Sequence, residues 1–370
     1  MPRQKLALRL TVTAAAVAVF PLLELGLRCG GFSYPPADQP MSIWNPVEDR
    51  AMRFGGGMFK TAPRELWVPR PGARIVWGDG EVINDAGYRG PLRRLEHPRD
   101  VLRIVVLGES ATFGYGVGYD ETFCGRLEEI LRQQGRRVEV IDAAVVGYTI
   151  VQGLERYRAF ARAYDPDIVI EAFGEVNEHI MAWGPSDLQK VEMPLLDGGP
   201  WTEIVKLIRH NVRAVQLVAK ISDRMNSARL LERDLEFRKL HYESELQEHM
   251  GEIDWKGQRR VPLDDFEKTL LTLRDELRAD EATLVVLSMP RRRGAEAKSP
   301  VLATYTERLT EIARREGLAF ADGWGAFRRA EENGVKEDDL FHDFWHPKPA
   351  GHKLLAESLA ERIGEITPAR

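Results

Sequence analysis

The chain of 370 residues contains only two cysteines, Cys29 and Cys124. Two cysteines exclude both a disulfide framework and a four-cysteine zinc site. A single bridge between them is an open alternative, although Cys29 stands at the end of an apolar N-terminal segment, far along the chain from Cys124. The scarcity of cysteine therefore excludes two kinds of structure but does not decide the compartment.

Excess positive charge is also missing, because the formal net charge is −5. The sequence has no stretch in which basic and aromatic residues are interleaved, so we expect no nucleic-acid partner. Internal repeats and low-complexity tracts are absent as well. With 44% hydrophobic and 29% charged residues, the composition is that of a globular protein with a substantial core.

The N-terminus carries Arg3, Lys5 and Arg9 and continues into an apolar run. Positive charge followed by an apolar segment is typical of an export signal. No cleavage site of small residues follows, and residues 6–27 reach the roughly 20 residues that span a bilayer. We therefore expect residues 1–28 to be an uncleaved membrane anchor, with the rest of the chain on the periplasmic or extracellular side. Secretion after cleavage and a buried cytosolic helix are the alternatives.

Apolar, β-branched runs alternate with helical periodicity along most of the chain. The run VLRIVVL at residues 101–107 is typical of a strand buried on both faces. Such alternation predicts an α/β fold, a three-layer α/β/α sandwich with a mainly parallel, five-stranded sheet of the flavodoxin-like kind. We expect Asp264 to be the N-cap of one helix. The expected strands are residues 101–107, 138–143, 168–173, 283–288 and 318–322, and the expected helices are 121–134, 152–163, 264–278, 304–316 and 350–363.

The region before the sheet, residues 29–100, is punctuated by glycine and proline, which is typical of a linker with a small β-containing extension. Within it, we expect residues 74–77 and 81–83 to pair as a hairpin. The next stretch, residues 83–90, has no side chain with a defensible catalytic role. We therefore interpret that stretch as structural packing.

Residues 178–262 interrupt the alternation and divide the main domain into residues 101–177 and 263–370. Apolar residues recur at helical spacing within 204–221, and a charged helical stretch, 230–250, follows. We interpret this region as a helical insertion. It could serve as a lid, a partner surface or a membrane-facing patch, or it could pack on the edge of the core.

A candidate nucleophile follows the first expected strand, because Ser110 ends the sequence LGES at residues 107–110. Ligands bind at this carboxyl end of the strands in open parallel sheets. A serine in a first helical turn also lies near free backbone N–H groups, which suit an oxyanion. The alternative is a serine that only caps the helix. The glycines Gly114, Gly116 and Gly118 lack the spacing of a dinucleotide-binding loop.

A candidate base and its orienting partner lie near the other end of the chain. Asp343 precedes His346 by three residues, in a loop before the last expected helix. At this spacing a carboxylate can hydrogen-bond one ring nitrogen and leave the other free to accept a proton from a serine. His342 could join His346 in a metal pair, but a metal needs a third ligand that we cannot assign. We therefore expect neither a metal nor a cofactor.

The order Ser110, Asp343, His346 resembles the SGNH (GDSL-like) hydrolase family, of the exported or membrane-anchored bacterial type. Two further blocks of the family match, because Gly147 follows the second expected strand and Asn177 follows the third. The resemblance implies that Ser110 is the nucleophile of a catalytic triad with His346 and Asp343. It also implies an oxyanion hole formed by the Ser110 and Gly147 N–H groups and the Asn177 side chain.

Two positions depart from the family pattern. Glu109 stands where the family usually has aspartate, a position outside the triad, and one extra residue separates Gly174 from Asn177. The resemblance covers residues 101–177 and 263–366. It therefore includes all four blocks and leaves out the insertion.

The resemblance implies a serine esterase-type hydrolase that cleaves a carboxylic (acyl or acetyl) ester of a small molecule or glycan through an acyl-enzyme. If a sugar hydroxyl replaces water as the acceptor, the protein is instead an O-acyltransferase acting on envelope polysaccharide. A non-catalytic glycan-binding or assembly protein is the third alternative. Its sign would be the loss of a triad residue, and all three residues are present.

Overall fold

The computed structural model describes residues 19–33, 58–62, 64–75, 80–173, 176–179, 186–192, 204, 207–208, 211–221, 259–298 and 300–367. The chain divides into two compact units. The smaller comprises residues 1–38 and 194–235, and the larger comprises residues 39–193 and 236–370. The insertion expected at 178–262 is therefore divided, since its middle part belongs with the N-terminal segment and its two ends belong with the sheet.

The larger unit is built on a five-stranded parallel sheet with the strand order β4-β3-β5-β6-β7. Every residue of β5 is buried, and so are all but the first of β3, because helices cover both faces. The predicted sheet is confirmed, and each strand lies within a residue of its expected ends. The strands are β3 (Leu102–Gly108), β4 (Val138–Asp142), β5 (Ile168–Ala172), β6 (Thr283–Leu287) and β7 (Ala319–Ala321).

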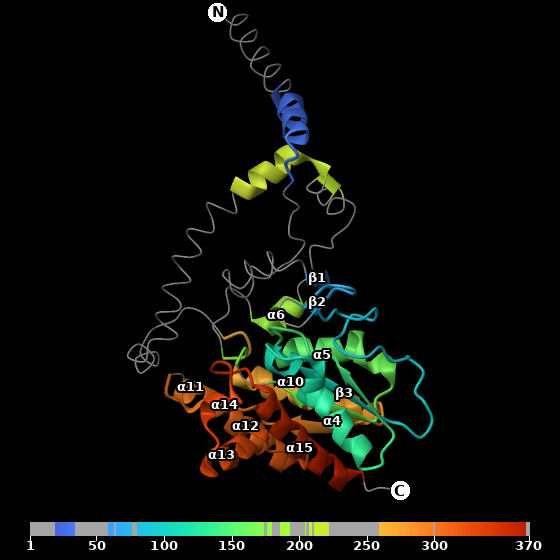
Figure 1. Ribbon diagram of the computed structural model, residues 1–370, viewed down its shortest axis with the longest axis vertical. Helices are drawn as coiled ribbons and strands as arrows, with labels where there is room; N and C mark the ends of the chain where they lie inside the picture. The colour runs from blue at the N-terminus through green and yellow to red at the C-terminus, as the bar shows by residue number, and fades with distance from the viewer. Residues whose placement is uncertain are drawn as a thin grey trace, which may run out of the picture. The chain divides into compact units, whose positions relative to one another are not determined.

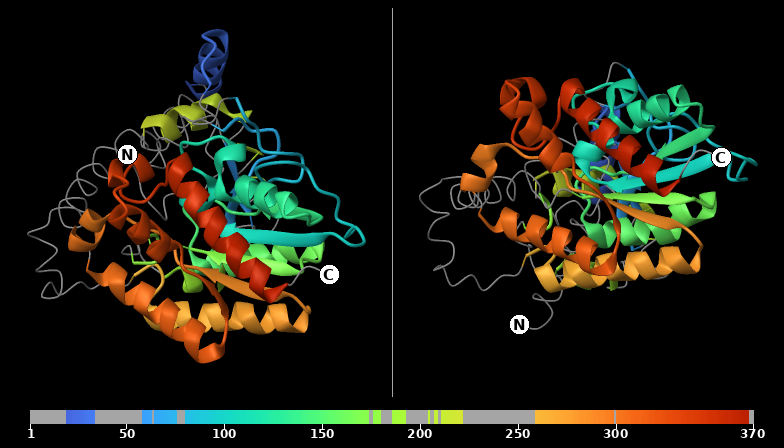
Figure 2. Two further views of the ribbon diagram at one scale, coloured as in Figure 1. Left: turned by 60° about the horizontal axis from the view of Figure 1, so that its bottom comes forward. Right: turned by 90° about the horizontal axis from the view of Figure 1, so that it is seen from below.

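Helices cover both faces of this sheet, which gives the predicted three-layer sandwich (Figure 1, Figure 2). On one face, α15 (Pro349–Ile366) packs against α4 (Phe123–Gln133). On the other face, α10 (Leu263–Ala279) packs against α5 (Ile150–Ala159) and α12 (Val301–Glu316). All five helices correspond to helices expected from the sequence, with ends displaced by up to four residues.

The start of α10 differs from the prediction. The sequence places Asp264 at the N-cap, whereas the helix begins at Leu263 and its N-cap is Pro262, whose carbonyl accepts the Phe266 N–H at 2.9 Å. Proline tolerates this position because it has no N–H to lose and its φ is compatible with a helix start. Asp264 and Asp265 therefore lie in the first turn, where their charge interacts favourably with the helix dipole.

The extension before the sheet contains a hairpin that the sequence does not predict. In it, β1 (Phe59–Ala62) pairs antiparallel with β2 (Leu66–Pro69). Four-residue strands carry too little periodicity to be recognised from sequence. The hairpin that we expected further along is present as a single antiparallel bridge between Arg74 and Val82, and residues 76–79 lie outside the described residues.

In the smaller unit, the described residues include a helix over residues 19–29 and a helical segment over 213–221. The two are in contact, since the Glu24 carboxylate accepts the Ala214 N–H at 2.8 Å. Figure 1 shows the second helix (yellow) crossing the end of the first (blue). The charged helix expected at residues 230–250 lies outside the described residues.

Only residues 19–28 of the expected membrane anchor are among the residues that the structure describes. Among the helices that are described, none combines the length and the apolar character needed to cross a membrane. Both cysteines are free, with Cys29 exposed and Cys124 buried, so the bridge that the sequence left open is not formed. The anchor itself stays a prediction.

Candidate active site

Ser110 is the first residue of α3 (Ser110–Phe113), a single turn that follows β3 directly. The N-cap of this turn is Glu109, whose carboxylate accepts the Ala111 N–H at 3.0 Å. The alternative of a purely capping serine is therefore wrong. The turn ends at Gly114, where φ is 84° and a residue with a side chain would be strained. This sharp change from strand to helix leaves Ser110 at the carboxyl end of the sheet.

Ser110, His346 and Asp343 form one chain of hydrogen bonds. Ser110 Oγ lies 2.9 Å from His346 Nε2, and His346 Nδ1 lies 2.7 Å from Asp343 Oδ2. The other carboxylate oxygen, Oδ1, accepts the backbone N–H groups of Trp345 and His346, each at 2.9 Å. The structure thus brings together three side chains that the sequence selected from opposite ends of the chain.

The surroundings of Asp343 stabilise its ionised carboxylate. Burial by itself would raise the pKa of the carboxyl group, but the hydrogen bond and charge of His346, together with two backbone N–H groups, lower it to about 2. The group is therefore ionised over the range in which histidine ordinarily titrates. An ionised partner keeps a proton on Nδ1 of His346 and stabilises the imidazolium that a proton transfer would create.

His346 is held from two sides. An antiparallel bridge between Phe341 and Pro347 closes the loop that carries it, and the His342 N–H donates to the His346 carbonyl at 2.9 Å. The ring of Tyr115 packs against the imidazole with a centroid separation of 4.4 Å and an interplanar angle of 33°. Tyr115 lies just after α3, so the segment that presents the serine also supports the histidine.

A second acceptor reaches the Ser110 hydroxyl. Ser110 Oγ donates to Glu109 Oε2 at 2.6 Å, and Glu109 is only 2% exposed. The hydroxyl has one proton, so Glu109 and His346 compete for it. Proton transfer to His346 therefore requires the hydroxyl to turn away from Glu109 and towards Nε2. The sequence marked Glu109 only as a departure from the usual aspartate and did not reveal this contact.

Gly147 lies in the turn after β4, and Asn177, which follows β5, hydrogen-bonds to that turn. Gly147 has a φ of 79°, in the left-handed region that favours glycine. Asn177 is buried, and its Nδ2 donates to the Tyr148 carbonyl at 2.9 Å, which engages one of its two N–H groups. This turn adjoins the nucleophile strand, because the Val145 N–H donates to the Gly108 carbonyl at 3.1 Å.

Arg89, from the N-terminal extension, supports the site from within the core and was not among the residues predicted from the sequence. Its guanidinium is fully buried and donates to the carbonyls of Phe113, Gly114 and Val117 at 2.6, 2.8 and 2.6 Å. The same group pairs with Glu81 at 2.6 Å. These bonds hold the loop that follows Ser110 and carries Tyr115, whose ring packs against His346. An arginine within a stretch otherwise assigned to packing was the only available sign in the sequence.

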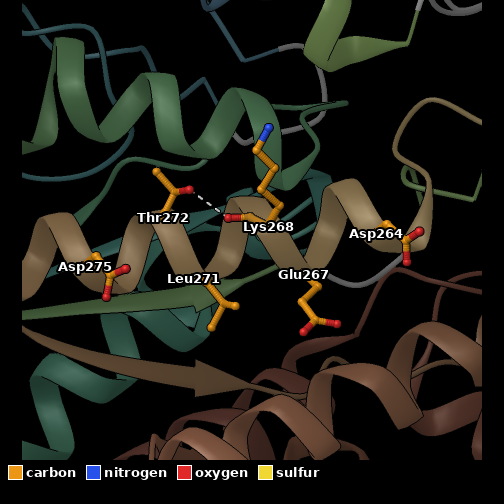
Figure 3. Close-up of a pocket in the computed structure, with 6 residues that line it drawn as sticks. All are labelled: Asp264, Glu267, Lys268, Leu271, Thr272 and Asp275. Carbon is orange, nitrogen blue, oxygen red and sulfur yellow. Dashed lines mark hydrogen bonds between the residues drawn. The ribbon is translucent and has the colours of Figure 1, made fainter.

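A shallow depression elsewhere on the surface contains none of the residues of this candidate active site. None of its residues takes part in the hydrogen-bonded chain described above, and the bond drawn in Figure 3, from Thr272 Oγ1 to the Lys268 carbonyl, stays within one helix. Within the described ranges, no group of three or more His, Cys, Asp or Glu residues could hold a metal ion. The depression is lined by six residues of α10, namely Asp264, Glu267, Lys268, Leu271, Thr272 and Asp275 (Figure 3).

The sequence profile of the GDSL-like lipase/acylhydrolase family matches residues 106–354. This range includes the four blocks on which the resemblance was based. The chain therefore belongs to the GDSL-like lipase/acylhydrolase family and is a hydrolytic enzyme. A search of curated proteins finds no match.

Several solved structures resemble the chain at low identity. An acetylxylan esterase from Geobacillus stearothermophilus is 17% identical, with a TM-score of 0.44, and the match covers 71% of this chain and 94% of that one. An alpha/beta hydrolase enzyme from the metagenome of Lake Arreo, Spain, is 17% identical, with a TM-score of 0.44 and coverages of 72% and 96%. A protein described as a GDSL-like lipase from Parabacteroides merdae is 14% identical, with a TM-score of 0.44 and coverages of 74% and 99%. Similarity at this level carries no argument about substrate.

Proposed function

We propose that the protein is a serine esterase that cleaves a carboxylic ester of a small molecule or glycan. The observation that carries the proposal is the unbroken chain from Ser110 through His346 to Asp343, with distances of 2.9 and 2.7 Å. These groups are the nucleophile, the base and the orienting carboxylate that acyl transfer requires. Membership of an acylhydrolase family supports ester chemistry at this site.

In the first half of the proposed reaction, Ser110 Oγ attacks the ester carbonyl carbon while His346 Nε2 takes the hydroxyl proton. Asp343 holds the imidazole and balances its positive charge. The N–H groups of Ser110 and Gly147 and the side-chain amide of Asn177 bind the tetrahedral oxyanion, and each well-aimed donor contributes roughly 10²–10³ in rate. His346 then returns the proton to the leaving alcohol, and an acyl-enzyme remains.

In the second half, His346 removes a proton from water, and the hydroxide attacks the acyl group on Ser110. Collapse of the second tetrahedral intermediate releases the acid and restores the serine hydroxyl. Because a sugar hydroxyl could attack in the same way, the choice of acceptor separates an esterase from an O-acyltransferase. We place hydrolysis first because the family is one of acylhydrolases.

Hydrolysis of short- and medium-chain p-nitrophenyl esters by the full chain tests this proposal. Ser110→Ala and His346→Ala should each lower kcat by about 10³-fold or more, since either change removes a reacting group. Ser358→Ala on α15 is the matched control and should keep wild-type kcat. An inert wild type, or triad variants as active as the wild type, would contradict the proposal. Transfer to added polysaccharide in place of hydrolysis would favour the acyltransferase.

We also propose that the N-terminal segment tethers this enzyme to a membrane, with the catalytic unit outside the cytoplasm. The supporting observation is the basic start of the chain, followed by the apolar run of residues 6–27. After expression in a bacterium, the chain should stay with the membrane fraction during a carbonate wash. External protease should then digest the catalytic unit in spheroplasts. A shortened chain in the medium would indicate secretion after cleavage.

A further inference from the structure

Most of the exposed apolar side chains lie in the smaller unit. Of the fifteen large apolar residues that are exposed in the described ranges, ten belong to it, with exposed fractions of 41% to 68%. Soluble monomers rarely leave many such side chains in water, so this concentration indicates a partner. The ten are Val19, Phe20, Leu22, Leu23 and Leu25 on the first helix, and Ile204, Leu207, Ile208, Val218 and Ile221 in the insertion.

The exposed residues of the insertion recur at a helical period. Ile204 and Ile208 are four residues apart, as in one turn of a helix, and Val218 and Ile221 are three apart. In the same helical segment, Ala214 and Gln216 are buried, with 4% and 1% of their surfaces exposed. One face of the segment therefore packs within the smaller unit, while Val218 and Ile221 lie on a face that is left exposed. A helix that only packs on a core in water would bury such large apolar side chains.

The positive charge of the same segment favours an anionic membrane as the partner. Residues 204–221 include no Asp or Glu, although the whole chain has a net charge of −5. A helix that combines an apolar stripe with basic residues alone is typical of a segment that lies in the interface of an anionic membrane. The basic residues of the segment are Lys206, Arg209, Arg213 and Lys220.

We propose that the helical segment over residues 213–221, together with the exposed residues Ile204, Leu207 and Ile208 before it, lies in the headgroup layer of an anionic bilayer, with the exposed apolar side chains towards the acyl chains. Within the smaller unit, this region contacts the helix over residues 19–29, because Arg28 donates to the Asn211 carbonyl at 2.5 Å. That helix continues the apolar run proposed as the tether. The helix over residues 19–29 and the segment over 213–221 thus belong to one proposed membrane-binding surface. The proposal deepens the tether and does not depend on ester hydrolysis.

The full chain in vesicles of phosphatidylglycerol and phosphatidylcholine tests this surface. In a Cys29→Ser background, a fluorophore attached through Val218→Cys should be quenched by brominated lipids, because interfacial helices lie about 5–10 Å into the headgroup–acyl boundary. Cys124 is buried and should not react. The matched control is Lys220→Cys, which is roughly 200° further round the helix and should stay accessible to iodide.

The outcomes separate the membrane from other partners. Quenching at position 218 should be weaker in purely phosphatidylcholine vesicles than in vesicles that contain phosphatidylglycerol. Equal quenching in the two kinds of vesicle would overturn the role of anionic headgroups. Equal access of iodide to positions 218 and 220 would overturn the interfacial placement. If the fluorophore at position 218 became protected from iodide without lipid as the protein concentration rose, the partner would be a second copy of the chain. This result would also overturn the interfacial placement. None of these readouts requires enzymatic activity.

A different observation concerns the N-terminal extension. Trp67, in β2, is fully buried, and its Nε1–H donates to the Val146 carbonyl at 3.0 Å. That carbonyl belongs to the same peptide group as the Gly147 N–H. In a trans peptide the two groups point in opposite directions. The bond to Trp67 therefore decides the direction of the Gly147 N–H.

The neighbouring peptide groups are held as well. The buried side chain of Arg260 donates to the Gly147 carbonyl at 3.0 Å. The Tyr148 hydroxyl donates to the Trp67 carbonyl, and the two aromatic rings meet edge to face at 5.5 Å. Bonds on both sides of Gly147 thus restrain a turn whose glycine could otherwise adopt many conformations.

We infer that Trp67 is a positioning residue of the oxyanion hole, which aims the Gly147 N–H at the developing oxyanion. This inference rests on the proposed esterase function. By this inference the extension contributes to the active site, whereas the sequence indicated only packing for its residues 83–90. A donor that is aligned before the reaction costs no reorganisation in the transition state.

Trp67→Phe tests the inference, because it removes the indole N–H and keeps an aromatic ring. The kcat for p-nitrophenyl esters should fall by about 10- to 100-fold while KM stays within about twofold, since the donor acts on the oxyanion more than on the bound ester. The matched control is Trp324→Phe. Among the described residues the buried Nε1 of Trp324 has no hydrogen-bond partner, so its loss should leave kcat unchanged.

Thermal unfolding shows whether the Trp67 variant folds. If it does not fold, benzothienylalanine at position 67 replaces the N–H by sulfur within a ring of the same size and should give the same loss of kcat. A folded variant with wild-type kcat, or one in which only KM rises, would overturn the inference. An inactive wild type would overturn the esterase proposal and this inference together, so the two failures are distinguishable.

Discussion

The two units of the chain differ in how far their apolar side chains are exposed to solvent. In the larger unit, Val106 and Ile170 in the sheet are fully buried, whereas Leu22 and Val218 in the smaller unit are 68% and 66% exposed. Both sets belong to apolar patterns that can be recognised in the sequence, a continuous run in the strands and a helical period in the insertion. The difference shows that such a pattern identifies an apolar face but not what covers it. The sheet is covered by its own helices, while the smaller unit leaves its apolar face exposed, and we propose that a membrane covers it.

The largest expected effect is confined to the larger unit. Asp343→Asn keeps the size of the side chain but removes its charge, so the tautomer of His346 is no longer selected. We expect kcat to fall by about 10³–10⁴-fold. Membrane binding, measured by vesicle flotation, should not change, because the proposed membrane-binding surface lies in the smaller unit. A variant within roughly tenfold of wild-type kcat would show that Asp343 does not orient the base.

A matched pair of leucines tests the comparison directly. Leu287 in β6 is fully buried, and Leu207 is 64% exposed. Leu287→Ala should lower the free energy of unfolding by about 2–5 kcal/mol, because it leaves a cavity in the core. Leu207→Ala should change it by less than about 0.5 kcal/mol and should weaken binding to anionic vesicles instead. Urea unfolding of both variants in one detergent measures the difference, and equal losses would place Leu207 in a core.

A smaller effect depends on pH. Burial, and then the charge of Arg89, lower the pKa of His352 in the folded protein from 6.5 to about 3. The unfolded chain therefore binds a proton that the folded chain does not, and the larger unit should lose stability as the pH falls from about 6.5 towards 3. Between pH 6.5 and 5 the loss should be about 1–2 kcal/mol. His352→Gln should flatten this dependence in thermal unfolding, and an unchanged slope would contradict the assignment to His352.

The sheet could be predicted from the sequence because a strand buried on both faces needs a continuous apolar run, and each run is visible by itself. The candidate site was accessible for a related reason. Ser110 follows directly on β3, and the spacing of Asp343 and His346 is short enough for one loop to form their hydrogen bond. Local sequence thus determined each half of the site.

Other features depended on neighbours that the sequence does not identify. The N-cap of α10 is Pro262 and not the predicted Asp264. Glu109 is both the N-cap of α3 and a second hydrogen-bond acceptor for Ser110. Arg89 lies in a stretch that we assigned to packing, yet its guanidinium binds the loop after the nucleophile. In each case the deciding contact is a choice between several chemically acceptable partners.

By itself, the sequence determined the class of fold, the order of the strands along the chain and the identity of the three side chains proposed for catalysis. Only the tertiary structure decided how these groups are aimed. Trp67 reaches Val146, and Ser110 reaches His346, across long separations in the chain. The direction of a peptide N–H or of an imidazole nitrogen depends on such long-range hydrogen bonds, because a residue's own backbone preferences leave several directions open.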